Sequence, residues 1–292
     1  MSPQGKQGNN ANRSHSSLFF RSRQPRTVRS PAVSGCPGIA ARGCDLHPGA
    51  AKCRILSSTR FRPLHTHPHP QGEPLMSQSP QYELLYFPIR GRAEQIRLLF
   101  HFSGTPFVDT GVTDWPGLKA KTPLGQLPIL IDRSGGDGEA ELVLPQSQAI
   151  VRHLARKLNL YGDSLREHAL ADVLGETVQD VRAKFVPVAF AARYNSTPET
   201  IEKYWSEVLP HSLGLLEKLL SRSTQPAAGY FVGAKPTYAD LLVFDLLDGN
   251  LTMKPACLDA HPALKAFVAR IAESPNLASY LATRRPSELK SS

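Results

Sequence analysis

A tyrosine at the end of a short apolar run is the first residue of this 292-residue chain whose position suggests chemistry. The run from Tyr82 to Phe87 is rich in strand-forming residues and is closed by Pro88, so we expect a strand buried on both faces. An amphipathic pattern follows from Arg92 and predicts a helix. The hydroxyl of Tyr86 would then lie between strand and helix, where it can donate a hydrogen bond to an anion. The alternative is a core tyrosine with only its hydroxyl at the surface.

The elements that must position this hydroxyl follow a β-α-β-β-α order. Gly104 ends the first helical pattern, and a second strand follows, which predicts a parallel crossover unit and an α/β domain. A glycine-rich turn between two later apolar runs predicts a β-hairpin. The expected elements after the first helix are a strand at 107–112, a short helical or irregular piece at 115–121, hairpin strands at 127–131 and 141–144, and a helix at 146–158.

Beyond residue 162 the strand patterns stop and amphipathic helical patterns continue to the end of the chain, which predicts an all-α second domain. Thr237 followed by Asp240 predicts a capping box, with Thr237 at the N-cap. The expected helices are 163–193, 198–221, 237–250, 262–273 and a last turn at 276–282.

The net charge of +9 lies in residues 1–75, which carry eleven basic residues against two acidic ones. The remainder is neutral, so it gives no argument for nucleic acid or a membrane surface as a partner. No apolar run is long enough to span a bilayer, and the N-terminus lacks the apolar core of a secretory signal. We expect a soluble, intracellular and cytoplasmic protein.

Residues 1–75 are rich in Arg, Ser, Pro, Gly and His and are expected to be a disordered basic extension. Their composition is typical of an organellar transit peptide, whereas Met76 could equally be the true start. The alternating His65, His67 and His69 could bind a metal weakly, but we expect no metal site.

The cysteines predict neither a disulfide framework nor a dithiol site. Cys36, Cys44 and Cys53 lie in the basic extension and Cys257 lies far beyond it, without a CxxC pattern. This usage indicates a reducing compartment, and it disfavours a dithiol oxidoreductase.

Four segments, in this order and spacing, resemble the soluble glutathione transferases, nearest the pi and sigma classes. The resemblance runs from about residue 81 to about residue 281 and includes Cys257–Ala260 and the capping box. It implies a thioredoxin-like glutathione-binding domain at 80–158 and an all-helical domain at 163–285. The four segments are Tyr86–Glu94, Trp115–Lys119, Gly125–Pro128 and Pro145–Ser147.

The resemblance assigns Tyr86 the activation of the glutathione thiol, and the energetics agree. A free thiol has a pKa near 8.5, so only a few per cent is thiolate at neutral pH. Lowering that pKa by about two units needs roughly 2.7 kcal/mol. A hydroxyl that donates to a charged acceptor contributes about 1.5 to 3 kcal/mol. Arg92 would add positive potential, although a solvated arginine is the simpler reading.

Other matching positions would bind the tripeptide. A cis Leu127–Pro128 bond, as the family has it, would let the Leu127 backbone pair with the cysteinyl residue, beside Gln126. Gln146 and Ser147 open a helix whose free N–H groups suit the γ-glutamyl carboxylate, although Ser147 could be an ordinary N-cap.

The resemblance also concerns the glycyl end of the tripeptide and the oligomeric state. Trp115 and Lys119, four residues apart, would reach the glycyl carboxylate. Asp180 matches an acidic residue that reaches glutathione in the neighbouring subunit, which implies a homodimer. Leu124 stands where the family has an aromatic key of the dimer, so that contact must differ in detail.

The implied second substrate is a small, largely apolar electrophile near Phe87 and Phe190. Phe190 replaces a second tyrosine of the pi class and removes a donor from that pocket. The resemblance therefore implies conjugation of glutathione to electrophiles. A sigma-type glutathione-dependent isomerase and a non-catalytic ligand-binding or structural relative are the alternatives.

Overall fold

The computed structural model describes residues 80–135 and 140–289, which belong to one compact unit. The predictions for residues 1–75, for Met76, for the three histidines and for the first three cysteines therefore lie outside the described residues. No helix in the described ranges is long and apolar enough to cross a membrane.

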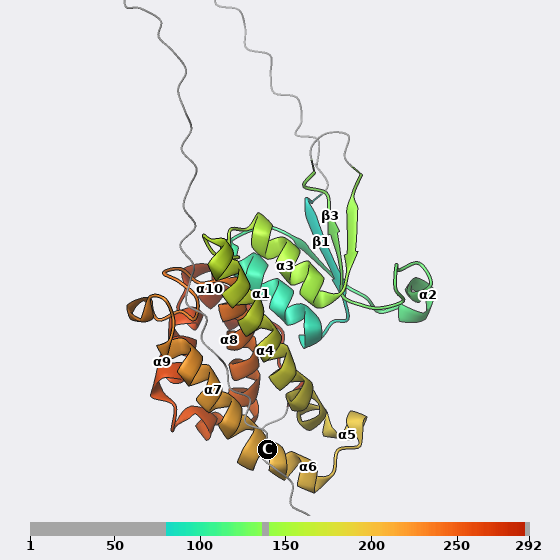
Figure 1. Ribbon diagram of the computed structural model, residues 1–292. Coiled ribbons are helices and arrows are strands. Elements are labelled where there is room, and N and C mark those ends of the chain that lie inside the picture. The colour runs from blue at the N-terminus through green and yellow to red at the C-terminus, as the bar shows by residue number, and fades with distance from the viewer. Residues whose placement is uncertain (1–79, 136–139, 290–292) are drawn as a thin grey trace, which may run out of the picture. The chain divides into compact units, whose positions relative to one another are not determined.

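A four-stranded mixed sheet carries the first half of the fold (Figure 1). Its strands are β1 (Tyr82–Tyr86), β2 (Val108–Gly111), β3 (Ile129–Asp132) and β4 (Leu142–Pro145), in the order β2-β1-β3-β4. β1 pairs with β2 in parallel, and β3 is antiparallel to both β1 and β4. The predicted parallel crossover and hairpin are both confirmed.

Strand β1 is buried fully on one face only, so the expectation of burial on both faces is wrong. Tyr82, Leu84 and Tyr86 are buried, whereas the alternate positions are half-buried. The second face holds a carboxylate, Glu83, that pairs with Arg133 at 3.1 Å and accepts a hydrogen bond from Thr110 at 2.9 Å. A charged group with these partners needs some access to solvent, which the half-buried face provides.

Two helices, α1 (Glu94–Ser103) and α3 (Ser147–Lys157), lie together against one side of the sheet, and the short α2 (Trp115–Lys119) lies away from them (Figure 1). A 3-10 turn, η1 (Gly91–Ala93), leads from β1 into α1. Gly104 ends α1 in the left-handed conformation, with φ +70°, as its position predicted.

The second half is all-helical, as expected, but two predicted helices are divided. The run 163–193 is α4 (Leu165–Ala189) and a separate turn, α5 (Ala191–Tyr194). The run 198–221 is α6 (Pro198–Lys203), a π-helical turn, η2 (Tyr204–Val208), and α7 (Leu209–Ser221). The remaining elements are η3 (Pro226–Ala228), α8 (Tyr238–Met253), η4 (Pro255–Leu258), α9 (Pro262–Ala272) and α10 (Pro275–Thr283).

Helix α8 is at the centre of this half, and most of its apolar side chains are fully buried. Its predicted capping box is present, with Thr237 at the N-cap and Asp240 three residues later.

A buried carboxylate, Glu94, joins α1 to the helical half because it accepts a hydrogen bond from the Tyr280 hydroxyl, at 3.0 Å to its Oε2 atom. Burial raises the pKa of Glu94.

Candidate functional site

Tyr86 is the last residue of β1 and is only 7% exposed. Its hydroxyl oxygen accepts a hydrogen bond from the main-chain N–H of Arg92 at 3.1 Å, and its own proton is left to donate. The loop can approach this closely because Gly91 has φ +47°, and a Cβ there would lie 2.6 Å from the hydroxyl. The loop therefore orients the hydroxyl as a donor.

Guanidinium groups hold this loop in place through its carbonyl oxygens. Arg97, which is 2% exposed, donates from Nη1 to the carbonyls of Ile89 at 2.9 Å and Arg90 at 3.2 Å. Arg182 of α4 donates to the carbonyl of Gly91 at 2.9 Å. The carbonyl oxygens of residues 89–91 thus accept hydrogen bonds from side chains of two different helices, α1 and α4.

The C-terminal segment after α10 holds the same loop from another side. Glu288 accepts a hydrogen bond from the main-chain N–H of Arg90 at 2.6 Å, and the Arg285 carbonyl accepts one from Arg90 Nε at 2.8 Å. The Arg285 guanidinium pairs with Asp109 at 2.7 Å. Residues nearly two hundred positions apart in the chain therefore fix the turn beside Tyr86.

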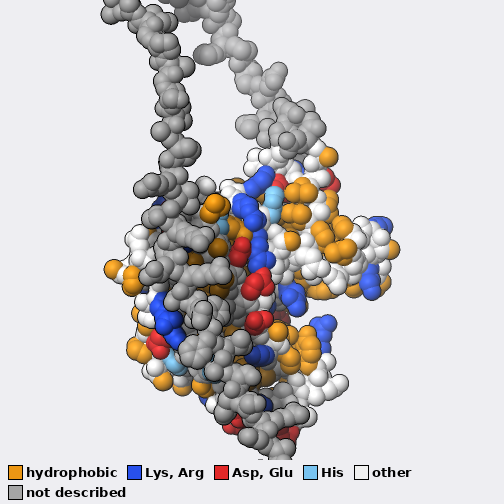
Figure 2. Space-filling model, viewed as in Figure 1, with side chains coloured by type: hydrophobic (Ala, Val, Ile, Leu, Met, Phe, Trp, Pro, Cys, Tyr) orange, Lys and Arg blue, Asp and Glu red, His pale blue; other side chains and the backbone are white. Residues whose placement is uncertain are grey.

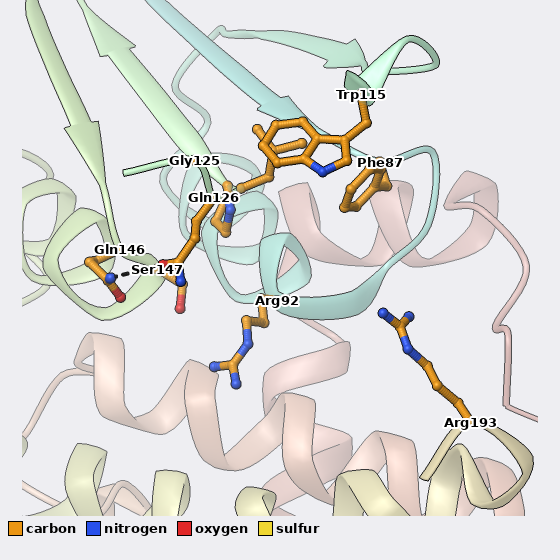
Figure 3. Close-up of a pocket in the computed structure, with 10 residues that line it drawn as sticks. Phe87, Arg92, Trp115, Gly125, Gln126, Gln146, Ser147 and Arg193 are labelled. Carbon is orange, nitrogen blue, oxygen red and sulfur yellow. Dashed lines mark hydrogen bonds between the residues drawn. The ribbon is translucent and has the colours of Figure 1, made fainter. Parts of the chain in front are cut away.

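A cavity of about 630 Å³ opens beside this turn (Figure 3). The Leu127–Pro128 peptide bond that borders it is cis, as expected. Figure 2 shows a hollow between the surface over α2 and the surface over α5, with Lys or Arg side chains at its edge. The cavity is lined by Phe87, Arg92, Trp115, Gly125, Gln126, Leu127, Pro128, Gln146, Ser147 and Arg193.

The N-terminus of α3 forms one wall of the cavity. Gln146 is the N-cap, with φ +73°, and its side-chain amide donates to Gln126 Oε1 at 3.2 Å. Ser147 is the first helical residue, so the reading of Ser147 as an ordinary N-cap is wrong. Its side chain is 7% exposed, and its hydroxyl has no hydrogen-bond partner among the described residues. The wall offers a hydroxyl and free helix N–H groups, which suit an anion.

Helix α2 contributes an aromatic edge to the opposite wall. The Trp115 ring meets the Phe87 ring edge-on, with centroids 5.8 Å apart. Lys119 at the end of α2 is exposed and does not line the cavity; its side chain lies over Gly125, whose added Cβ would meet Lys119 Cε at 3.6 Å. The structure thus brings Trp115 to the cavity and leaves Lys119 at its rim.

Tyr86 itself lines a second, smaller cavity of about 180 Å³ and not the larger one; the two cavities share Arg92 and Arg193. Phe190 lines it, whereas Asp180 is exposed on α4 and lines none of the cavities described here. Arg182 lines this cavity and pairs with Asp245 at 2.6 Å; burial raises the pKa of Asp245, and Arg182 acts in the opposite direction. The lining is Tyr86, Ile89, Gly91, Arg92, Arg182, Val186, Phe190, Arg193 and Tyr194.

Arg193 and Tyr194 are among the cavity residues that are absent from the sequence-based prediction. Both lie on α5, which exists because α4 ends at Ala189 and the chain turns at Phe190, with φ −121° and ψ 47°. The run through Phe190 continues a helical pattern, so it gave no sign of this turn. The nearest usable signal was Pro187, which falls inside α4.

Two family models match this chain. Residues 82–156 match the glutathione S-transferase N-terminal domain, and residues 179–284 match the glutathione S-transferase C-terminal domain. The sheet-bearing half and the helical half of the fold thus match the two domains of one enzyme class.

Individual relatives support the same assignment. A glutathione S-transferase of Dirofilaria immitis is 36% identical over 71% of this chain and 95% of its own length. The solved pi-class glutathione S-transferase of Onchocerca volvulus is 36% identical, with a TM-score of 0.61 over 70% of this chain and 93% of its own. A glutathione S-transferase of Necator americanus, described as monomeric, is 29% identical, with a TM-score of 0.62 over 72% and 100%. The chain belongs to the glutathione S-transferase family.

Proposed function

We propose that this protein conjugates the thiol of glutathione to small electrophiles, with Tyr86 as the hydroxyl that stabilises the thiolate. The observation that carries the proposal is the state of that hydroxyl: its oxygen accepts from Arg92 N–H, which leaves its proton to donate, and Tyr86 lines the cavity of about 180 Å³ that shares Arg92 and Arg193 with the larger cavity. In the reaction the thiolate forms a C–S bond, and the electrophile releases a leaving group with its electron pair or takes up a proton.

The proposed binding mode places each part of glutathione on a different wall. The γ-glutamyl carboxylate would lie at the N-terminus of α3, near Gln146 and Ser147, where a hydroxyl and helix N–H groups are free. The cysteinyl main chain would pair with Leu127, next to Gln126. The glycyl carboxylate would lie near Trp115 and Lys119, and Arg92 would add positive potential. The electrophile would lie near Phe87 and Phe190.

We also propose that two chains share the site as a homodimer, with Asp180 reaching glutathione in the partner subunit. Asp180 is exposed on α4 and outside its own chain's cavities, as that role requires. Exposed apolar side chains, Val173 on α4 and Leu142 and Val143 on the edge strand β4, support an interface. Leu124, 54% exposed, would take the position of the aromatic key.

Domain limits and cellular location complete the proposal. The glutathione-binding domain would be residues 80–158, from β1 through α3, and the helical domain residues 163–285, from α4 through α10. We place the enzyme in the cytoplasm, where thiols are kept reduced, with an organelle as the alternative if residues 1–75 are a transit peptide.

The direct test replaces Tyr86 with phenylalanine, which keeps the ring and removes the donor. We expect the thiol pKa of bound glutathione to rise toward 8.5 and the conjugation rate near neutral pH to fall roughly ten- to a hundredfold. The rate should recover above pH 8.5, because bulk titration then supplies thiolate. Thiolate absorbance of the bound tripeptide, titrated in both proteins, measures the shift.

A second variant controls for the loss of any tyrosine hydroxyl from the strand. Tyr82→Phe removes a buried-strand hydroxyl that donates to Ser134 at 3.1 Å, outside the cavity. It should leave the titration unchanged. Coincident midpoints for wild type and Tyr86→Phe would show that another donor activates the thiol.

A further inference from the structure

Three adjoining cavities near Tyr86 are lined by arginines and by no carboxylate of the described residues. Cavities of about 630, 180 and 380 Å³ adjoin at Arg92, which lines all three. The other charged residues that line these cavities are Arg182 and Arg193. Within the described residues, no Asp or Glu lines any of the three cavities. This composition gives the site a positive potential that a neutral electrophile does not need.

One of these arginines is already neutralised and two are not. Arg182 is held between Asp245 and the Gly91 carbonyl. Arg92 and Arg193 are exposed, and neither guanidinium has a hydrogen bond or an ion pair with any residue the structure describes. Figure 3 shows Arg193 extending from α5 toward Phe87, from the opposite wall to Arg92.

The acidic side chains of a neighbouring cavity have partners other than Arg193. Asp245, Asp248 and Glu288 line a neighbouring cavity together. Asp248 pairs with Arg284 at 2.9 Å, and Glu288 accepts from a main-chain N–H at 2.6 Å. These carboxylates are engaged elsewhere, so the charge of Arg193 remains uncompensated.

The base of Arg193 is fixed although its side chain is exposed. The Phe190 carbonyl accepts from the N–H groups of Arg193 at 2.9 Å and Tyr194 at 3.1 Å. Ser196 Oγ donates to the Pro187 carbonyl at 2.9 Å and holds the turn against α4. The turn therefore fixes the main chain from which the guanidinium extends, and Arg193 and Phe190 line the same cavity of about 180 Å³.

We propose that the electrophile site selects substrates that carry an anionic group, typically a carboxylate on an apolar or aromatic body, and that Arg193 determines this selectivity. The body would pack on Phe190 and the carboxylate would take a two-pronged hydrogen bond from Arg193. The proposal rests on the transferase function proposed above. Glutathione is itself an anion, so an anionic second substrate would be repelled unless free arginines offset its charge.

Two arylidene ketones that differ only in one distant group provide the probes. Each is 4-phenyl-3-buten-2-one with a para substituent, carboxymethyl in one and carboxamidomethyl in the other. The glutathione thiolate adds to the β-carbon, the π pair moves toward the carbonyl, and the α-carbon takes a proton from water. Nothing leaves, and the para group does not react, so the pair isolates the effect of charge.

The experiment compares kcat/KM for both ketones in wild type, Arg193→Gln, Arg193→Lys and Arg166→Gln. Arg166 is the matched control, an exposed arginine on α4 that lines none of the cavities and has no side-chain partner among the described residues. We expect Arg193→Gln to lower the anionic-to-neutral ratio roughly five- to thirtyfold. Arg193→Lys should give a ratio between those of the wild type and Arg193→Gln. Arg166→Gln should give the wild-type ratio.

Three results would contradict parts of the proposal in distinguishable ways. An unchanged ratio in Arg193→Gln, with the neutral ketone still turned over, overturns the role of Arg193 alone. A rise in the KM for glutathione without a change in the ratio assigns Arg193 to the tripeptide instead. Failure of the wild type to conjugate even the neutral ketone counts against the transferase function itself.

Discussion

Ser147 presents a hydroxyl to the glutathione cavity without any hydrogen-bond partner among the described residues. Because Ser147 lines this cavity, its hydroxyl is free to form a hydrogen bond with a ligand there. Its neighbour Gln146 occupies a left-handed conformation, φ +73°, that few side chains adopt readily. Local strain and an unmet hydroxyl at one point are typical of a binding position.

Ser147→Ala should therefore weaken glutathione binding without impairing the chemical step. A hydrogen bond to a carboxylate contributes about 1.5 kcal/mol or more, so the KM for glutathione should rise at least tenfold while kcat stays within about twofold. Steady-state kinetics with glutathione varied at saturating electrophile measures both. Ser279→Ala, an exposed serine on α10, is the control; an unaltered KM in Ser147→Ala would remove Ser147 from the site.

The sequence predicts a site residue well where local chemistry determines its place. The place of Tyr86 at the end of its strand was predicted from the apolar run closed by Pro88, whereas its role in activating the thiol comes from the family resemblance and stays a prediction. Ser147 was assigned to the correct helix end, but the choice between N-cap and first helical residue depends on the conformation of Gln146. Arg193 was missed because its position depends on a turn that no local pattern marks.

At the scale of elements, the start of α8 shows how a buried charge can organise a helix. Asp240 is fully buried and accepts from the N–H groups of Phe231 at 2.9 Å and Thr237 at 2.8 Å, and from the Thr237 hydroxyl at 2.8 Å. Since α8 contacts α1, α3, α4 and α9, this cap supports the packing of both halves.

Asp240→Ala should destabilise the protein by about 3 kcal/mol or more, because it leaves two buried N–H groups and a hydroxyl without an acceptor. Asp240→Asn, which keeps one acceptor oxygen, should lose less and still fold. Urea unfolding at fixed protein concentration gives the free energies. Asp259→Ala, on an exposed ion pair with Lys265, should change stability by under about 0.5 kcal/mol. Equal losses in Asp240→Ala and Asp259→Ala would refute the argument.

Element boundaries were predictable where a capping or breaking residue marks them. Gly104 and the Thr237 capping box gave the end of α1 and the start of α8. The π-helical turn at 204–208 and the break at Phe190 were not predictable, because apolar side chains continue through both without a change of period. Tertiary packing, which the single sequence does not specify, determines these irregularities.

At the scale of the whole molecule, the assembly state decides whether one chain has a complete site. Helix α4 carries both Asp180 and exposed apolar side chains, and these features support a dimer. The Necator americanus relative described as monomeric has the same fold at 29% identity, so the fold does not determine the assembly.

We expect sedimentation at micromolar concentration to give twice the mass of one chain. Val173→Asp, which places a charge at a 58% exposed apolar position on α4, should shift the protein toward monomer. If Asp180 acts across the interface, that monomer should bind glutathione more weakly, and Asp180→Ala should weaken binding in the dimer. A Val173→Asp monomer with full activity would exclude a shared site.

The C-terminal segment supports the loop beside Tyr86 through hydrogen bonds, and this has a consequence for biosynthesis. Glu288, which accepts from Arg90 N–H, follows Arg90 by 198 residues. At about 5 to 20 residues per second, a ribosome makes these partners roughly 10 to 40 s apart. The strand β1 and Tyr86 precede this interval and the rest of the sheet is made during its first third, but the loop lacks its last support until the interval ends. A nascent chain cannot complete this site before its final helix has been made, so the timing of translation delays the appearance of activity.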